Sequence, residues 1–248
     1  MSSALANIPA ESDALCEGCG YVLNGLPAGG NCPECGKPTS ESAATLRHAA
    51  AWEQSGPALM RFISTTYQVL AHPTHFYRSL ATRKTRESST RFAQVHWMIA
   101  SLLLGAAGYA HFSWYLYLGS LPGALDRLNY PIPAVLIFGM IVYLLLAATT
   151  RVAGWLTSLE AKYWGMRLPL PVVLRGLDYH AAHYLPVAVM GCVTTVGYQF
   201  LLHRHFYLVN YISAPTYLYV LCGEVIVAAV YLFKTYWIGM KNMMYANG

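Results

Sequence analysis

The 248-residue chain is too apolar for an ordinary soluble domain, because 56% of its residues are hydrophobic and only 11% are charged, against roughly 25% in soluble proteins. Residues 1–91 carry 15 of the 27 charged side chains (16 basic and 11 acidic), so residues 92–248 are charge-poor. This distribution argues against a wholly water-soluble helical core and predicts a polar N-terminal part followed by a membrane-embedded part.

Four cysteines near the N-terminus form two C-x2-C pairs, Cys16 with Cys19 and Cys32 with Cys35. A two-residue spacer lets both thiolates of a pair turn toward one ion, and two pairs supply the four sulfurs of a closed structural zinc site. Glycines follow both pairs, at positions 20 and 36, and permit the left-handed turn that brings N–H groups toward the sulfurs. The spacing predicts a zinc ribbon at residues 13–38, within an N-terminal region of residues 1–38.

So short a segment rarely folds without a metal or disulfides, and a reducing cytoplasm disfavours disulfides. Metal binding is therefore expected to supply the folding free energy. The pattern resembles bacterial zinc ribbons, and its Cys-x-x-Cys-Gly-Tyr opening and Cys-Pro-x-Cys-Gly close are similar to rubredoxin, which holds iron. Zinc is the expected metal and iron the alternative, because rubredoxin's two cysteine pairs lie much further apart in sequence. Four sulfur ligands leave no open position, which predicts a structural role.

Residues 39–56 are polar and alanine-rich and predict a linker, a tether with possible short helical content. Residues 57–91 predict an amphipathic juxtamembrane segment. In it, apolar side chains recur at spacings of three and four between 59 and 70. Pro73 is expected to end this helix before a second short one. The aromatic residues Phe76 and Tyr77 suit either the lipid headgroup region or packing against the protein's own helices.

Beyond residue 91, three windows contain no Asp, Glu, Lys or Arg (92–125, 128–150 and 179–203), and a fourth, 205–233, contains only Glu224. Each window exceeds the ~20 residues that span a bilayer. We predict four transmembrane helices, at about 95–118, 131–152, 182–202 and 212–234, in a bundle spanning residues 92–248. The expected fold class is mainly α, a polytopic membrane helical bundle with a small N-terminal zinc ribbon.

Basic residues are concentrated in alternate segments between these windows, which is the pattern of the positive-inside rule. Arg83, Lys84, Arg86 and Arg91 precede the first helix, whereas the next connection holds only Asp126 and Arg127. Residues 1–15 lack the basic start and apolar core of a secretory signal. Both termini are therefore predicted to be cytoplasmic. The same bias accounts for the isoelectric point near 8.8, so no nucleic-acid partner is expected.

Three stretches resemble the Yip-domain family of small multi-pass membrane proteins. The first is Leu70, Pro73, Phe76 and Tyr77 before a basic loop, the second is residues 166–191, and the third is the aromatic ending YLFKTYWIGMKNMMYANG. The resemblance covers roughly residues 59–241. Family members commonly have five membrane segments, whereas four are expected here. The resemblance implies a role in membrane organisation or trafficking through protein partners, and it brings no catalytic residues.

Two groups of polar residues stand out in the apolar part. Glu224 falls about 12 residues into the fourth predicted helix, where a carboxylate is costly unless it is protonated, paired or hydrated. His111 is its most plausible partner, and the pair predicts either an ion or proton relay or an anchor for a partner helix. The structural alternative is a neutral acid bonded to a nearby hydroxyl or backbone carbonyl. Asp178, His180 and His183 form the second group, which could hold a transition metal or serve as interfacial residues.

The sequence contains no phosphate-binding glycine loop, no His-Glu-x-x-His and no Gly-x-Ser-x-Gly, and we expect no catalytic residues. The predicted function is that of a non-enzymatic membrane protein, bound to the lipid bilayer, that recruits or assembles protein partners through its zinc ribbon. The alternatives are a redox subunit with iron in the cysteine site and a small ion- or proton-coupled transporter that uses Glu224.

Overall fold

The computed structural model describes residues 13–27, 29–82, 84–118, 131–204 and 214–247. Helices dominate this part of the chain, and it contains isolated β-bridges but no strands. The residues form two compact units. Unit 1 comprises residues 1–93, 149–182 and 234–248, and unit 2 comprises residues 94–148 and 183–233. Neither unit is continuous in sequence, because unit 1 combines the N-terminal part with two later segments.

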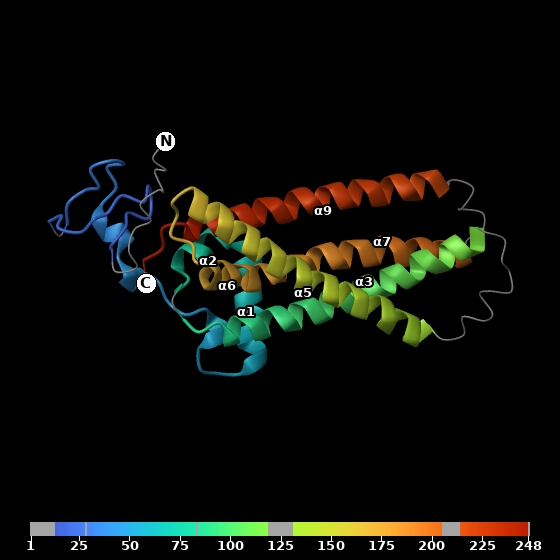
Figure 1. The fold of residues 1–248 in the computed structure, drawn as a ribbon. Helices are drawn as coiled ribbons and strands as arrows, with labels where there is room; N and C mark the ends of the chain where they lie inside the picture. Colours follow the sequence, from blue (N-terminus) through green and yellow to red (C-terminus); the bar gives the residue numbers. More distant parts are fainter. Residues whose placement is uncertain (1–12, 28, 83, 119–130, 205–213, 248) are drawn as a thin grey trace. The chain divides into compact units, whose positions relative to one another are not determined.

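Four helical segments within the described ranges are long and apolar enough to cross a membrane, as predicted from the sequence: Glu87–Ser113, Ile132–Tyr163, Leu170–Leu201 and Pro215–Met243. The corresponding long helices are α3 (Glu87–Leu118), α5 (Pro131–Tyr163), α7 (Tyr184–Arg204) and α9 (Ala214–Met243), which appear as the long ribbons of Figure 1. The polar connection at Asp126 and Arg127 and the basic residue Arg83 lie outside the described residues.

Three of these helices continue well beyond the predicted membrane segments. α3 begins eight residues before the expected start at about 95, α5 continues to Tyr163 instead of about 152, and α9 continues to Met243 instead of about 234. α5 ends at Tyr163, and Gly165, two residues later, has φ +68 and lets the Met166 N–H donate to the Ala161 carbonyl at 2.8 Å. A left-handed glycine of this kind satisfies carbonyls that a helix end leaves unpaired.

Unit 1 is built from these helix extensions together with shorter elements. They are α1 (Ala58–Ala71), α2 (Pro73–Ser79), α6 (Leu170–His180) and three 3-10 turns between Thr39 and Glu53. The break between α1 and α2 falls at Pro73, as predicted. Phe76 and Tyr77 are buried in the unit's apolar core with Phe92, Tyr179 and Met243, so these aromatics pack against the protein itself.

Unit 2 contains a close approach of α3 and α5. A Cβ atom added to Gly105 would lie 2.6 Å from the Val135 carbonyl oxygen and 2.8 Å from the Gly139 nitrogen, and Gly139 itself faces the Ser101 carbonyl. Ser101 and Gly105 are small residues four positions apart on α3, a spacing that lets membrane helices approach each other closely. Of the chain's charged residues, unit 2 holds only four: Asp126, Arg127, Arg204 and Glu224.

Candidate metal centre

The two C-x2-C pairs lie on turns with the same hydrogen-bond pattern. In each turn, the first cysteine's N–H donates to the carbonyl five residues on (Cys16 to Tyr21 and Cys32 to Lys37, both 2.8 Å). The following glycine's N–H donates back to the first cysteine's carbonyl, at 2.8 Å and 2.9 Å. Gly20 and Gly36 have φ values of +83 and +70, which confirms the left-handed conformation that the sequence predicts.

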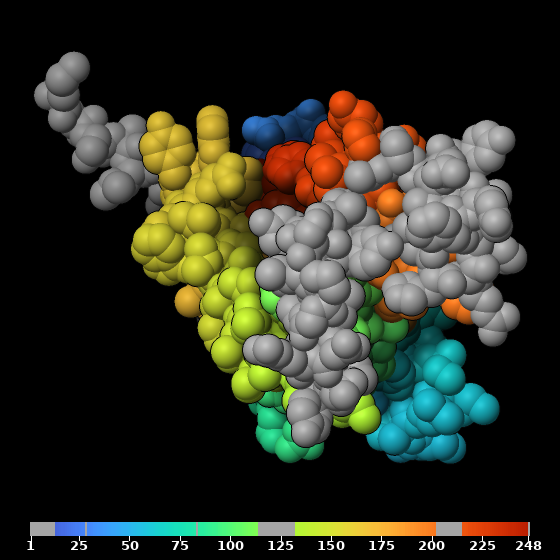
Figure 2. Space-filling view, turned by 90° about the vertical axis from the view of Figure 1, so that its right-hand side faces the viewer, coloured from blue at the N-terminus to red at the C-terminus, as the bar shows by residue number. Residues whose placement is uncertain are grey.

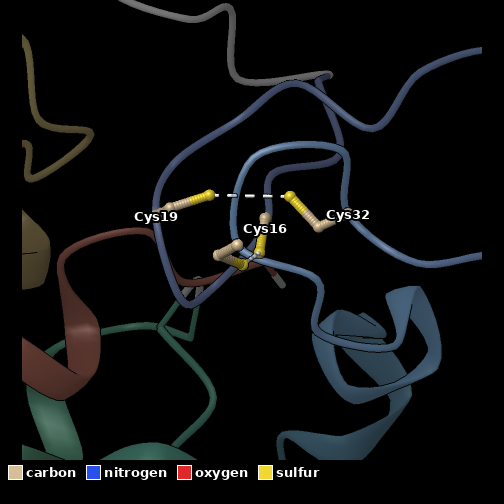
Figure 3. A group of neighbouring side chains, drawn as sticks. Cys16, Cys19 and Cys32 are labelled. Carbon is tan, nitrogen blue, oxygen red and sulfur yellow. Dashed lines mark hydrogen bonds between the residues drawn. The ribbon is translucent and has the colours of Figure 1, made fainter.

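These turns bring the four sulfur atoms together. The Cys16 and Cys35 sulfurs are 3.5 Å apart, the Cys19 and Cys32 sulfurs are 3.6 Å apart, and all four lie within 4.8 Å of one another. Figure 3 shows the Cys19 and Cys32 side chains pointing toward each other from opposite turns. All four cysteines are free thiols. A tetrahedral site with Zn–S bonds of about 2.3 Å has S–S edges of about 3.8 Å, so the four residues fit one ion.

The cysteine thiols differ in pKa. The backbone N–H of Cys35, with that of Glu34, lowers the pKa of the Cys32 thiol from 9.0 to about 7. Partial burial raises the pKa of the Cys19 thiol to about 12, although the Tyr21 N–H opposes this shift. A cation would supply the charge that lets all four sulfurs ionise together. The donor set suits zinc or iron, and a closed four-sulfur site holds either as a structural or electron-transfer centre.

The four-cysteine module, residues 13–38, contains two isolated bridges, Leu15–Val22 and Asn31–Pro38, in place of extended strands. In the described part of the module, these two bridges do not confirm the zinc ribbon that the cysteine spacing predicts. Cys16 and Cys32 are buried, Cys19 is half-buried and Cys35 is exposed. The metal would thus be covered on one side and reachable by solvent at Cys35.

Asn247, in the segment that follows α9, makes hydrogen bonds to this module. Its side-chain amide accepts from the Leu15 N–H at 2.9 Å and donates to the Leu15 carbonyl at 2.6 Å and the Ser42 carbonyl at 2.7 Å. Arg167 donates to the same amide oxygen at 2.8 Å. Leu15 is fully buried and Asn247 is only 5% exposed. Because Leu15 directly precedes Cys16, this contact positions the first cysteine turn.

Arg47 makes the second attachment, although it belongs to the segment predicted to be a tether. Its guanidinium forms a two-point ion pair with Glu17, at 2.7 and 3.0 Å, and donates to the backbone carbonyls of Tyr77, Leu80 and Asn242. The side chain of Arg47 is 1% exposed. Residues 39–56 have the expected short helical turns, but they are packed into unit 1.

The described hydrogen-bond partners of Glu224 and His111, which the sequence predicts as an intramembrane pair, are hydroxyl groups. Glu224 accepts a hydrogen bond from the Thr194 hydroxyl, and His111 Nδ1 lies 3.1 Å from the Tyr217 hydroxyl. Tyr217 in turn stacks on Tyr198 with ring centroids 4.1 Å apart. The contact of Glu224 with a hydroxyl group is the structural alternative that the sequence left open.

Asp178, His180 and His183 do not converge on a common point. Within the described residues, the only cluster of three or more His, Cys, Asp or Glu side chains with metal-binding geometry is the four-cysteine group. Asp178 is completely buried and accepts hydrogen bonds from Arg86, Ser89 and Thr90. The two histidines bond to the Thr235 and Tyr231 hydroxyls.

Sequence reasoning missed the buried charged network of unit 1. Arg175, 1% exposed, pairs with Glu53 at 2.6 Å and donates to the carbonyls of Ala81 and Thr85. Tyr179 also donates to Glu53, at 2.6 Å. The one available signal was the α6 pattern, in which Arg175, Asp178 and Tyr179 share a helical face.

Comparison of the chain with protein-family models, with curated proteins and with solved structures finds no match.

Proposed function

We propose that this chain is a non-enzymatic integral membrane protein in which a structural zinc ion shapes a module that recruits a protein partner to the membrane. The observation that carries the proposal is the convergence of four free thiols within 4.8 Å of one another in a chain with four potential membrane-spanning helices. The positive-inside pattern of the sequence predicts that the module is cytoplasmic, which supports this proposal. The Yip-domain resemblance agrees with a role in organising membrane-bound partners.

The four-cysteine module has features that suit partner binding. Its attachments through Asn247 and Arg47 hold it in one arrangement within unit 1. Its first turn exposes the apolar side chains Tyr21 and Val22, which are 36% and 39% exposed. A loop fixed by a metal loses little conformational entropy when a partner binds, so that more of the contact energy becomes affinity.

A photocrosslinking experiment in membranes tests this proposal. A photoreactive amino acid at Val22 should give a discrete adduct, and the same group at Leu170, which is similarly exposed (37%), should not. The adduct partner, once identified by mass spectrometry, should bind the purified zinc-loaded protein and lose binding when Tyr21 is replaced by alanine. Equal labelling at both positions, or binding that survives the loss of zinc, would overturn the proposal.

Two alternative functions predict different experimental results. An iron-containing redox subunit requires visible absorption and stoichiometric iron in the purified protein. An ion- or proton-coupled transporter requires that Glu224→Gln abolish transport in vesicles while leaving assembly intact. The bond between Thr194 and Glu224 favours a structural role for this carboxyl group, because hydroxyl donors commonly satisfy polar side chains inside membrane bundles.

A further inference from the structure

Helix α1 has two apolar faces, and only one of them is covered by the described residues. Thr65 and Val69 are fully buried on the inner face. On the outer face, Leu59, Met60, Ile63 and Tyr67 are 68%, 68%, 52% and 62% exposed. In Figure 2, the cyan atoms of this segment lie at the surface. Four large apolar side chains gathered on one helical face are more than the scattered exposure that soluble surfaces normally show.

The inner face of α1 packs against the start of a membrane-spanning helix. Phe62 lies 5.5 Å from Phe92 of α3 and 6.0 Å from Trp52, measured between ring centroids. Along α3, the exposed ion pair Glu87–Arg91 precedes Phe92, and the exposed apolar residue Met98 follows it by six residues. At 1.5 Å per residue, six residues span about 9 Å. α1 therefore packs against the start of α3, at Phe92, which follows an exposed ion pair and precedes an exposed apolar residue along the same helix.

The charge around α1 also suits a membrane surface. Residues 54–86 contain no Asp or Glu but five Lys or Arg. The single charged residue within α1, Arg61, points back to the Trp52 and Gln54 carbonyls, so the outer face has no charged group that must be dehydrated. Arg78 and Arg86 are paired with Glu41 and Asp178, so the segment presents little free positive charge. It also brings no carboxylate of its own that would repel anionic headgroups.

We propose that the outer face of α1 lies on the lipid bilayer at headgroup depth, so that α1 is an interfacial helix between the rest of unit 1 and the leaflet. Leu59, Met60, Ile63 and Tyr67 enter the boundary of the acyl chains. The neighbouring polar residue Gln68, on the edge of this face, remains in water. This inference concerns the lipid contact of unit 1 and stands apart from the partner that the zinc module recruits.

Fluorescence quenching on the full-length, zinc-loaded protein in vesicles containing anionic lipid tests the proposal. In a background in which Cys192 and Cys222 are replaced by serine, bimane is attached at Ile63→Cys or Tyr67→Cys, with Gln68→Cys as the matched control on the same helix. The unsubstituted background, treated alike, should take up no label. Nitroxide-bearing lipids should strongly quench the labels at 63 and 67, and iodide should quench the label at 68.

Two results would overturn the proposal. Iodide quenching of all three labels to the same extent, with no effect of lipid nitroxides, would show that α1 faces water. Protection of positions 63 and 67 from both quenchers would show that a protein surface, either a second copy or another chain, covers this face. Metal analysis of the same sample shows whether a label has released zinc. In that case, positions 59 and 60 provide replacement labelling sites on the same face.

Discussion

At the residue scale, local contacts shape the two cysteine turns of the metal centre, and a long-range contact positions the first turn. The two cysteine turns depend on neighbours within six residues, through Gly20, Gly36 and the N–H groups that point at the sulfurs. The placement of the first turn depends on Asn247, which is 232 positions away from Leu15. Metal loading and the packing of the segment after α9 are therefore expected to respond to each other.

Replacement of Asn247 by alanine should loosen the four-cysteine module. The change leaves the buried Leu15 N–H and two carbonyls without their partner, which costs on the order of 1–3 kcal/mol for each unsatisfied group that water does not reach. Hydrogen exchange should report faster exchange of the Leu15 and Cys16 amides. Asn242→Ala is the matched control, because that side chain donates one bond to Ile238 within its own helix. Equal exchange in the two variants would contradict the assigned role.

The buried and exposed ion pairs of unit 1 should differ sharply in their effect on stability. Arg175→Ala leaves Glu53 buried without its cation, a change that costs roughly 3–5 kcal/mol. Arg78→Ala removes a pair with Glu41 whose side chains are 55% and 48% exposed, and such pairs contribute about 0–1 kcal/mol. Denaturation of the detergent-solubilised protein measures both variants. Similar losses would show that the Arg175 network is not buried in solution.

At the element scale, three of the long helices are divided between the two compact units. α3, α5 and α9 each have residues in both compact units. Each of these helices therefore contributes apolar residues to unit 2 and polar or aromatic residues to unit 1. α6 and η4 (Ala181–His183) precede α7 in the same way.

The α3–α5 contact provides a prediction at this scale. In Gly105→Val, the new side chain would meet the α5 backbone at 2.6 Å, so the helices must separate, and overpacking of this kind costs typically 1–3 kcal/mol. Thermal aggregation in detergent should begin at a lower temperature than in the parent protein. Gly197→Val is the control, because a Cβ atom at Gly197 in α7 has nothing within 4 Å. A tolerated valine at 105 would contradict the close approach.

Particular residues show how far the sequence could be interpreted. The cysteine cluster was predictable because spacing and glycine placement act locally. The four spans were predictable because windows without charge have no other common explanation. The helix ends were not, since Arg151, Lys162 and Lys234 mark the edge of an apolar window but favour helix continuation. The contacts of Arg47, Glu53 and Asn247 join segments that are far apart in sequence, so no local sequence pattern predicts these contacts.

At the scale of the whole molecule, the charge distribution agrees with the division into two units. Unit 2 contains four of the charged residues in the sequence, and only Glu224 among them has a described side chain. Unit 1 contains the rest and uses several of them in buried pairs with Arg47, Arg86 and Arg175. Charged side chains are therefore concentrated in unit 1 and nearly absent from unit 2.

Topology is the prediction that belongs to this scale. The even number of spans and the basic residues in alternate connections predict that both ends of the chain are on the cytoplasmic side. Reporters fused before Met1 and after Gly248 should both be active in the cytoplasm. A reporter pair with opposite readings would require an odd number of spans, and two exposed ends would reverse the predicted location of the metal centre.

The central claim, that the four cysteines of a membrane-embedded chain hold one structural zinc ion, is tested most directly by metal analysis of the protein purified from membranes. The account predicts one zinc per chain, with four sulfur neighbours in X-ray absorption, and loss of that zinc in Cys16→Ser but not in Cys222→Ser. Stoichiometric iron, or zinc that remains after Cys16→Ser, would contradict it.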